Sequence, residues 1–78
     1  MYRVRKRDGE LVDFNINKIS GAIKKAFEAT GTDYNDSVID FLSLKVTADF
    51  QDKIKDGAVT VEDVQDSVEA VLSRGGYE

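Results

Sequence analysis

Basic side chains gather around a turn and a helix start near the beginning of the chain. Four of the first seven residues are basic (Arg3, Arg5, Lys6 and Arg7), whereas residues 8–78 contain 7 basic and 15 acidic side chains, a net charge of −8. An Asp8-Gly9 turn follows, and Asn15 then opens a helical pattern with Lys18 in its first turn. Lysine and arginine side chains beside the free N–H groups of a helix start commonly bind phosphates. The sequence therefore predicts an anion-binding region here.

Lys18 is unusual for its position in the expected helix. With Asn15 as the N-cap, Lys18 is the third helical residue, where the helix dipole favours a carboxylate and a cation costs up to about 1 kcal/mol. One interpretation is an ordinary surface ion pair with Asp13 or Glu10, worth about 0–1 kcal/mol. The other is that its ammonium group meets the cations of the turn around a phosphate chain. The side chains that would then converge are Lys6, Arg7 and Lys18.

The composition limits the chemistry that this chain can perform. Its 78 residues include no cysteine and no histidine, so thiolate metal ligands and the commonest general base are missing. The two common phosphate-binding fingerprints, Gly-x-x-x-x-Gly-Lys-Ser/Thr and Gly-x-Gly-x-x-Gly, are missing as well. We therefore expect binding of a phosphate-bearing ligand without hydrolysis, and neither catalytic nor metal-binding residues.

Charge and hydropathy bear on the partners and the location of the chain. A net charge of −4 and a pI near 4.7 do not suit a domain that coats nucleic acid, so no nucleic-acid partner is expected. No apolar run is long enough to span a membrane and no leader precedes the first strand, so we expect a cytoplasmic protein that does not bind membranes. Residues 1–78 suit a single small domain, which buries about 60–65% of the surface that the unfolded chain exposes.

Two short runs of alternating apolar and polar residues flank the Asp8-Gly9 turn and predict a β-hairpin. A two-residue loop would mix apolar and polar side chains on both faces of the hairpin. A three-residue loop over residues 7–9, with Gly9 in the left-handed region, instead pairs Val4 with Val12. The apolar side chains then share one face; they are Tyr2, Val4, Val12 and Phe14.

Helical spacing and capping residues predict two helices after the hairpin. The first covers residues 16–30, with Asn15 as its N-cap and Gly31 as its left-handed stop. The second begins after Asn35 or Asp36 and runs to the turn at residues 56–57. Its buried stripe is expected to consist of Val38, Phe41, Leu42, Val46, Phe50 and Ile54.

Residues 58–76 predict a short strand and a third helix. Ala58-Val59 is expected to lie beside the hairpin, and Thr60 to cap a helix that ends at residues 74–76 and buries Val64, Val68, Val71 and Leu72. The acidic residues of this helix are interpreted as a solvated face in preference to a metal site. They are Glu62, Asp63, Asp66 and Glu69. The predicted fold is α+β, with a three-stranded cap on a bundle of three to four helices.

Three segments of the sequence, in order, resemble one known domain. They are Val4-x-Lys6-Arg7-Asp8-Gly9, then Val12-x-Phe14-Asn15-x-x-Lys18-Ile19-x-x-Ala22-Ile23-x-Lys25-Ala26, and then Val61-Glu62-Asp63-Val64-Gln65-Asp66-x-Val68-Glu69-x-x-Leu72. Together they resemble the ATP-cone, the regulatory nucleotide-binding domain of ribonucleotide reductases, over nearly the whole chain. The third segment and the Gly-Gly-Tyr ending look most like the anaerobic class (class III), which reduces ribonucleoside triphosphates.

The resemblance implies a regulatory role and a larger parent protein. It implies that the chain is an amino-terminal piece of a reductase whose overall activity ATP switches on and dATP switches off, with Mg²⁺ accompanying the effector. It also implies contact with the catalytic domain of the parent reductase and effector-dependent self-association. The family fold, a small β cap over a helical bundle, agrees with the pattern above and usually continues into a fourth helix.

The resemblance also implies a set of nucleotide-binding residues. The set is Val4, Lys6, Arg7, Asn15, Lys18, Ile19, Val61 and Gln65. The three cations would hold the phosphates, Val4 and Ile19 would flank the base, and Asn15 would lie beside the nucleotide at the helix start. Val61 and Gln65 stand where the family often has Thr and either His or Asp, so the sugar contacts here would differ.

Two other functions remain open from the sequence. Repressors of reductase genes carry the same cone, although usually after a cysteine-rich zinc ribbon, and this chain has no cysteine. Alternatively, the replacements at Val61 and Gln65 mark a cone that has lost nucleotide binding and serves only as an interaction domain.

Overall fold

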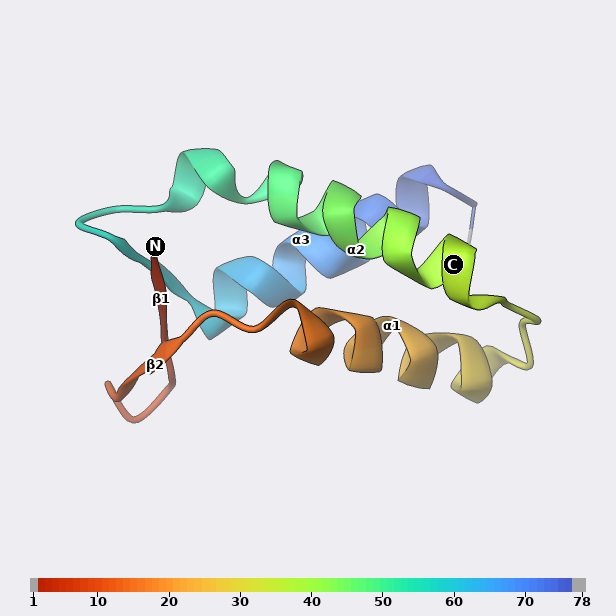
Figure 1. Cartoon of the computed structure of the whole chain (residues 1–78), viewed down its shortest axis with the longest axis horizontal. Coiled ribbons are helices and arrows are strands. Elements are labelled where there is room, and N and C mark those ends of the chain that lie inside the picture. Colours follow the sequence, from red (N-terminus) through yellow and green to blue (C-terminus); the bar gives the residue numbers. More distant parts are fainter. Residues whose placement is uncertain (1, 77–78) are drawn as a thin grey trace.

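Three helices lie side by side, and a small sheet covers one end of them (Figure 1). The computed structural model describes residues 2–76. The helices are α1 (Ile16–Thr30), α2 (Asp36–Asp49) and α3 (Val61–Arg74), and the strands are β1 (Arg3–Arg5), β2 (Leu11–Asp13) and β3 (Ala58–Thr60). The predicted α+β fold is thereby confirmed, whereas Tyr77 of the Gly-Gly-Tyr ending lies outside the described residues.

The sheet has the strand order β2-β1-β3, so β1 is its central strand. β1 is antiparallel to β2, with Val4 opposite Val12, and parallel to β3, with Val4 opposite Val59. At the tip, the Lys6 N–H donates to the Glu10 carbonyl at 2.8 Å, and Gly9 has a φ of 90°. The three-residue loop and its left-handed glycine are confirmed, since this φ is strained for any residue with a Cβ.

The apolar face of the hairpin packs on the helices through aromatic rings. Phe50 is fully buried, and its ring centroid lies 5.8 Å from that of Tyr2 and 5.8 Å from that of Phe14. Burying such a ring contributes about 1.5–3 kcal/mol relative to leaving it exposed. Val12 stays 37% exposed because it lies on the edge strand β2. Phe50 therefore fixes the sheet against the bundle.

The boundaries of α1 agree with the sequence prediction. The Asn15 side chain accepts a hydrogen bond from the Asn17 N–H at 2.9 Å. At the other end Gly31 adopts a left-handed φ of 69°, and the Thr32 N–H reaches the Phe27 carbonyl at 2.9 Å. Both ends are fixed by neighbours within a few residues, which is why the pattern located them.

The prediction for α2 is wrong at its end and partly wrong in its buried stripe. Asn35 caps the helix as expected, but α2 ends at Asp49, and a short 3-10 turn over Gln51–Lys53 follows. Phe41 is 58% exposed, while Ile39 is 1% exposed in its place. The helix packs against both α1 and α3, so its position between two neighbours, and not a single apolar stripe, decides which side chains are buried.

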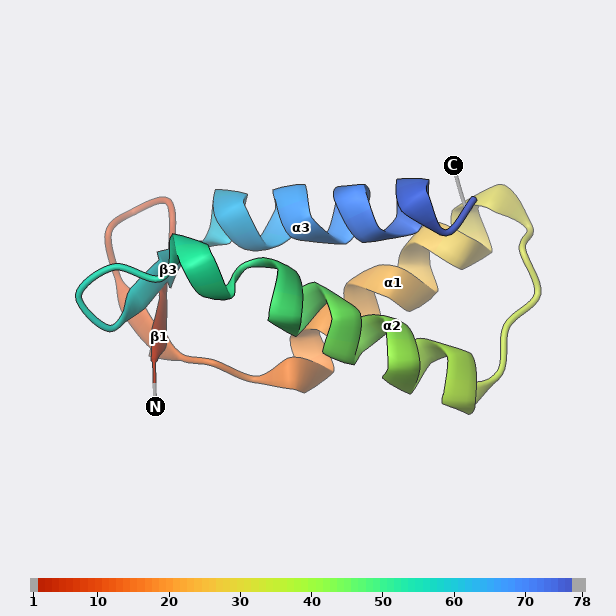
Figure 2. The ribbon, with the colours of Figure 1, turned by 90° about the horizontal axis from the view of Figure 1, so that it is seen from above.

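A tight turn at residues 56–57 explains why no helix continues to that point. Asp56 and Gly57 have φ values of 53° and 76°, and Lys55 exchanges backbone hydrogen bonds with Ala58 at 2.8 and 3.0 Å. Positive φ at two successive residues is the geometry of a two-residue hairpin turn, which needs extended chain on both sides. This turn sends β3 back along β1 and places the start of α3 beside the sheet (Figure 2).

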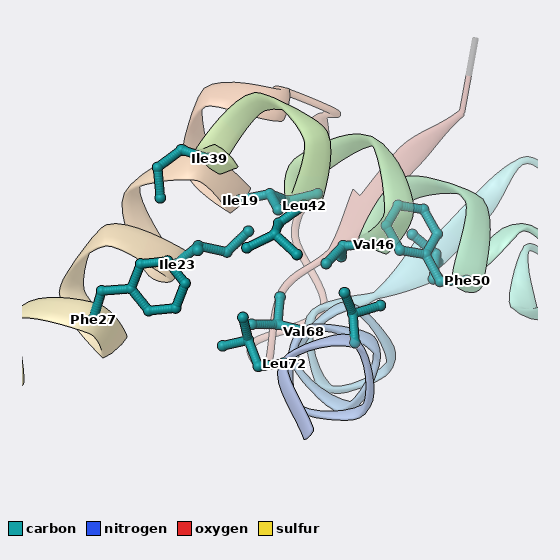
Figure 3. Packing of buried hydrophobic residues seen from close by; sticks show 11 residues of the cluster. Ile19, Ile23, Phe27, Ile39, Leu42, Val46, Phe50, Val68 and Leu72 are labelled. Atoms are coloured by element: carbon teal, nitrogen blue, oxygen red, sulfur yellow. The ribbon is translucent and has the colours of Figure 1, made fainter. Parts of the chain in front are cut away.

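Side chains of all three helices meet in one core (Figure 3). Ile23, Val46 and Phe27 are essentially inaccessible to solvent, with exposed fractions of 0–1%. Of the stripe predicted for α3, Val68, Val71 and Leu72 are buried, and Val64 packs at the edge. The core therefore holds the starts of α1 and α3 at the sheet end of the bundle, where the predicted ligand residues lie (Figure 2).

Candidate anion-binding site

A shallow hollow lies between the hairpin tip and the first residue of α3. It has a volume of about 330 Å³ and is lined by Lys6, Arg7, Asp8 and Val61. This volume is at the lower end of the range for small-molecule sites, about 300–1,000 Å³. Two of the predicted phosphate ligands and one predicted sugar contact are thus brought together from segments more than 50 residues apart.

Both cations of the hollow are exposed, and each is paired with a carboxylate. The Lys6 Nζ atom lies 3.4 Å from Glu10 Oε1, and the Arg7 Nε atom donates to Glu62 Oε2 at 2.9 Å. Exposed pairs of this kind contribute about 0–1 kcal/mol. An incoming phosphate can therefore replace either carboxylate at small cost.

The turn geometry that aims these cations comes from Asp8 and Gly9. The Asp8 Oδ1 atom accepts the Glu10 N–H at 2.9 Å, and the Gly9 N–H donates to the Lys6 carbonyl at 2.9 Å. Side-chain acceptance two residues on is the usual device of aspartate in turns. Asp8 has no cationic partner within residues 2–76, so its structural role accounts for its position.

The start of α3 forms the other wall of the hollow. Thr60 caps the helix by accepting the Asp63 N–H at 3.0 Å, as predicted. Val61 is half-buried, and Gln65 lies exposed one turn further along the helix. Residues four apart share one helix face, so Val61 and Gln65 present a methyl-bearing and an amide-bearing side chain on the same side.

Lys18 lies outside this hollow, at the start of α1. Its side chain is exposed, and among residues 2–76 no carboxylate lies within 4.0 Å of its ammonium group. Glu10 pairs with Lys6, and Asp13 lies 3.6 Å from Arg3. The interpretation of Lys18 as half of an ordinary surface pair is therefore wrong for the described chain.

The hairpin itself separates the tip from the start of α1. β2 leads away from the tip to Asn15, and residues 10–15 span about 17 Å if fully extended. Figure 2 shows the tip beside the start of α3, whereas α1 begins beyond the opposite end of β2. Val4 lies half-buried on the central strand, and Ile19 is only 3% exposed in the core below it. The structure thus groups Lys6, Arg7 and Val61, and leaves the contacts of Val4, Asn15, Lys18, Ile19 and Gln65 with a ligand as predictions.

Glu62 was not recognised from the sequence as a residue of this site. The pattern grouped it with the solvated acidic face of the third helix, and nothing local connects it with Arg7, which is 55 residues away in the chain. Residues 2–76 contain no group of three or more His, Cys, Asp or Glu side chains arranged to hold a metal ion. In this structure Glu62 is an ion-pair partner of the tip.

Two larger hollows lie elsewhere and suit an anion less well. One, of about 570 Å³, has three basic and three acidic residues among its lining: Arg5, Lys53, Lys55, Asp52, Asp56 and Asp63. The other is a mostly apolar groove of about 520 Å³ between α2 and α3, which contains none of the predicted ligand residues.

At the edge of that groove Arg74 Nη2 donates to Asp49 Oδ1 at 2.6 Å, and this bond holds the pKa of the Asp49 carboxyl below its ordinary value.

No helix in residues 2–76 has the length and apolar character needed to cross a membrane. The longest, α1, has 15 residues, whereas a span of the bilayer core takes about 20.

Comparison with known proteins identifies the family to which this chain belongs. A family model described as the ATP cone domain matches residues 2–78. The chain therefore belongs to the ATP-cone family, which confirms the resemblance seen in the three sequence segments.

Curated relatives are found among reductases. The chain is 36% identical over 76 residues to the vitamin B12-dependent ribonucleoside-diphosphate reductase of Mycobacterium tuberculosis, in the sequences of strains CDC 1551 / Oshkosh and ATCC 25618 / H37Rv. The alignment covers 97% of this chain and 10% of each relative. The chain thus spans about a tenth of the length of these relatives, and their vitamin B12-dependent class differs from the anaerobic class that the sequence resembled.

Proposed function

We propose that this domain binds ATP or dATP and thereby regulates the overall activity of a ribonucleotide reductase of which it is a part. Membership of the ATP-cone family and the 36% identity to a reductase support the proposal. The observation that carries it is the hollow in which Lys6 and Arg7 meet the start of α3, since the chain beyond the tip is strongly acidic. A local positive site on an acidic domain selects a small anion and not a polyanion.

The residues present suit a nucleoside triphosphate. Lys6 and Arg7 would hold phosphate oxygens, because guanidinium and ammonium groups form charge-assisted hydrogen bonds with them. Lys18 would add a third cation from the start of α1, where the helix dipole also favours an anion. Val4 and Ile19 would flank the base, provided that the ligand reaches the half-buried face of β1.

The remaining contacts in the proposal concern the sugar and the effector's counter-ion. Asn15 would lie beside the nucleotide through its amide nitrogen, because its side-chain oxygen already accepts the Asn17 N–H. Val61 and Gln65 would flank the ribose with a methyl group and an amide. Mg²⁺ would accompany the phosphates as part of the ligand and not as an ion held by the domain alone.

Regulation in this proposal requires no covalent step in the domain. Nucleotide binding would change which surfaces the cone offers to the catalytic domain of the parent reductase and to a second copy of itself. ATP and dATP differ only in the ribose 2′-hydroxyl, so any difference between their effects must arise at the residues that touch the sugar.

The class of the parent enzyme is a separate hypothesis. The resemblance of the third segment favours an anaerobic ribonucleoside-triphosphate reductase, whereas the identity to the mycobacterial proteins favours a vitamin B12-dependent diphosphate reductase. The chain that follows residue 78 in the parent protein distinguishes the two. A glycyl-radical motif near its far end supports the anaerobic class, and its absence favours the B12-dependent one.

A calorimetric titration of the domain with ATP and with dATP tests the proposal. We expect saturable heat with both nucleotides and a clear loss of affinity in an Arg7→Gln variant, because Arg7 lines the hollow. Arg3→Gln is the matched control, since Arg3 is also exposed but lines no part of the hollow. No heat with either nucleotide at cellular concentrations would refute nucleotide binding and favour a cone that serves only as an interaction domain.

A further inference from the structure

Among the residues that the structure describes, one ion pair ties the hairpin tip to α3. The Arg7 Nε–H donates to Glu62 Oε2 at 2.9 Å, and the two residues are 55 positions apart. The second pair at the tip, between Lys6 and Glu10, stays within the hairpin. Of these two pairs, only that of Arg7 connects the tip with a helix of the bundle.

Glu62 occupies one of the N–H donors of Arg7 that a phosphate could use. A guanidinium group has five N–H donors in one plane and binds carboxylate and phosphate oxygens by the same geometry. Since a carboxylate on its Nε–H lowers the local positive charge of Arg7, a phosphate that binds there competes with Glu62. The two anions also repel each other if both remain in the hollow.

We propose that Glu62 is an internal competitor of nucleotide phosphate for Arg7, so that nucleotide binding breaks the link between the hairpin tip and α3. This inference rests on the proposed function, in which Arg7 holds phosphate. Glu62 then sets the affinity of the site and reports its occupation to α3.

The position of Glu62 makes the exchange inexpensive. It is the second residue of α3, where the helix dipole stabilises a carboxylate whether or not a cation is beside it. The side chains of Arg7 and Glu62 are 73% and 53% exposed, so water solvates the released carboxylate. Neither partner is left buried and unpaired, and the exchange is therefore readily reversible.

Breaking this link has a consequence that loss of the Lys6–Glu10 pair would not have. β1 and β3 stay hydrogen-bonded, so the sheet remains attached to the start of α3, but the tip beyond Arg5 loses its ion pair with that helix. The released tip and the released Glu62 carboxylate both lie on the outer surface, where a second domain can distinguish the bound form from the free form.

The test compares Glu62→Gln with Glu69→Gln in ATP titrations of the domain. Glu69 is a matched control because it is exposed on the same helix and forms no ion pair within residues 2–76. Glutamine keeps the shape of the side chain and removes its charge. We expect Glu62→Gln to bind ATP about two- to fivefold more tightly than the wild type, and Glu69→Gln to change the affinity by less than about 1.5-fold.

A double-mutant cycle isolates the role of Arg7. In an Arg7→Gln background, Glu62→Gln should no longer improve the affinity, because the guanidinium group for which Glu62 and phosphate compete has been removed. An equal gain in both backgrounds, an equal gain for Glu69→Gln, or weaker binding by Glu62→Gln would each overturn the inference while leaving nucleotide binding intact. If neither the wild type nor Glu62→Gln binds ATP, the proposed function fails, and the inference fails with it.

Discussion

The replacement of Lys18 by alanine separates a phosphate contact from diffuse charge attraction. Lys18 is exposed and has no ion pair within residues 2–76, so Lys18→Ala leaves no partner unsatisfied. It also removes a cation from the third position of α1, where the helix dipole disfavours it, and introduces the best helix former. The free energy of unfolding without nucleotide should therefore rise by a few tenths of a kcal/mol, to about 0.5 kcal/mol.

The affinity for ATP should change in the opposite direction. A lost charge-assisted contact with phosphate costs about 1–3 kcal/mol, or roughly tenfold to a hundredfold in affinity. If Lys18 instead acted only through space, a cation two Debye lengths (roughly 16 Å) from about four negative charges would contribute about 0.1–0.2 kcal/mol at 0.15 M salt. That is less than a twofold change, so the two cases differ by far more than the error of a titration.

Calorimetry at 0.15 M salt measures this effect, with urea unfolding of the same proteins as the stability check. Two controls remove one positive charge each at exposed positions: Arg3→Ala on β1 and Lys25→Ala two turns further along α1. Both should alter the affinity by less than about twofold. If Lys18→Ala behaves like these controls, Lys18 does not touch the ligand, and the hollow at the tip and α3 holds the phosphates alone.

Two further predictions concern stability. The buried Ser67 hydroxyl makes no hydrogen bond of good geometry within residues 2–76, although it lies near enough to Asp49 to help lower the pKa of that carboxyl, so Ser67→Ala should change the free energy of unfolding by less than about 1 kcal/mol. Ser43→Ala should lower the free energy of unfolding by about 1–2 kcal/mol, because the Ser43 hydroxyl is hydrogen-bonded to the Ile39 carbonyl and the Ser20 hydroxyl at 2.8 Å each. Urea unfolding measures both variants, and a larger loss for Ser67→Ala than for Ser43→Ala would contradict both predictions. Arg74 lowers the pKa of Asp49 below its ordinary value of 3.8, so their pair stabilises the fold above that pH and stops doing so as the pH falls through the lowered pKa. Arg74→Gln should thus cost up to about 1 kcal/mol at pH 7, and its unfolding free energy should converge with that of the wild type in acid; a constant difference between pH 7 and pH 2 would count against the pair.

The features that the sequence predicted correctly depend on residues close together in the chain. Asn15 and Thr60 cap their helices through N–H groups two and three residues away. The register of the hairpin follows from the alternation of side chains and from a glycine that can adopt φ 90°. Such devices act before any tertiary contact forms, so a pattern is sufficient to locate them.

The errors arose where distant segments decide the structure. The apolar residues of α2 surround the helix, so spacing alone did not distinguish the exposed Phe41 from the buried Ile39. The helix ends at Asp49 although apolar spacing continues to Ile54. Phe50 packs against Tyr2 and Phe14 of the distant hairpin, and the turn at residues 56–57 needs extended chain before it. Tertiary packing of this kind overrides local helix propensity, and the residue pattern of the segment alone does not predict it.

The candidate site shows the same division. A cluster of cations in an acidic chain and the turn that aims them were visible in the sequence, and the structure places Lys6 and Arg7 in one hollow. The pairing of Arg7 with Glu62 was not visible, because it depends on the parallel contact of β3 with β1 that carries the start of α3 to the tip.

The central claim is that one nucleotide contacts both the hairpin tip and the start of α1, two regions that β2 separates. An NMR titration of the ¹⁵N-labelled domain with ATP tests it most directly, because the amide groups of residues 6–9 and 16–18 report on each region independently. We predict that both sets of resonances shift together and saturate with one dissociation constant. Shifts confined to one region, or two sets that saturate at different ATP concentrations, would contradict a single shared triphosphate.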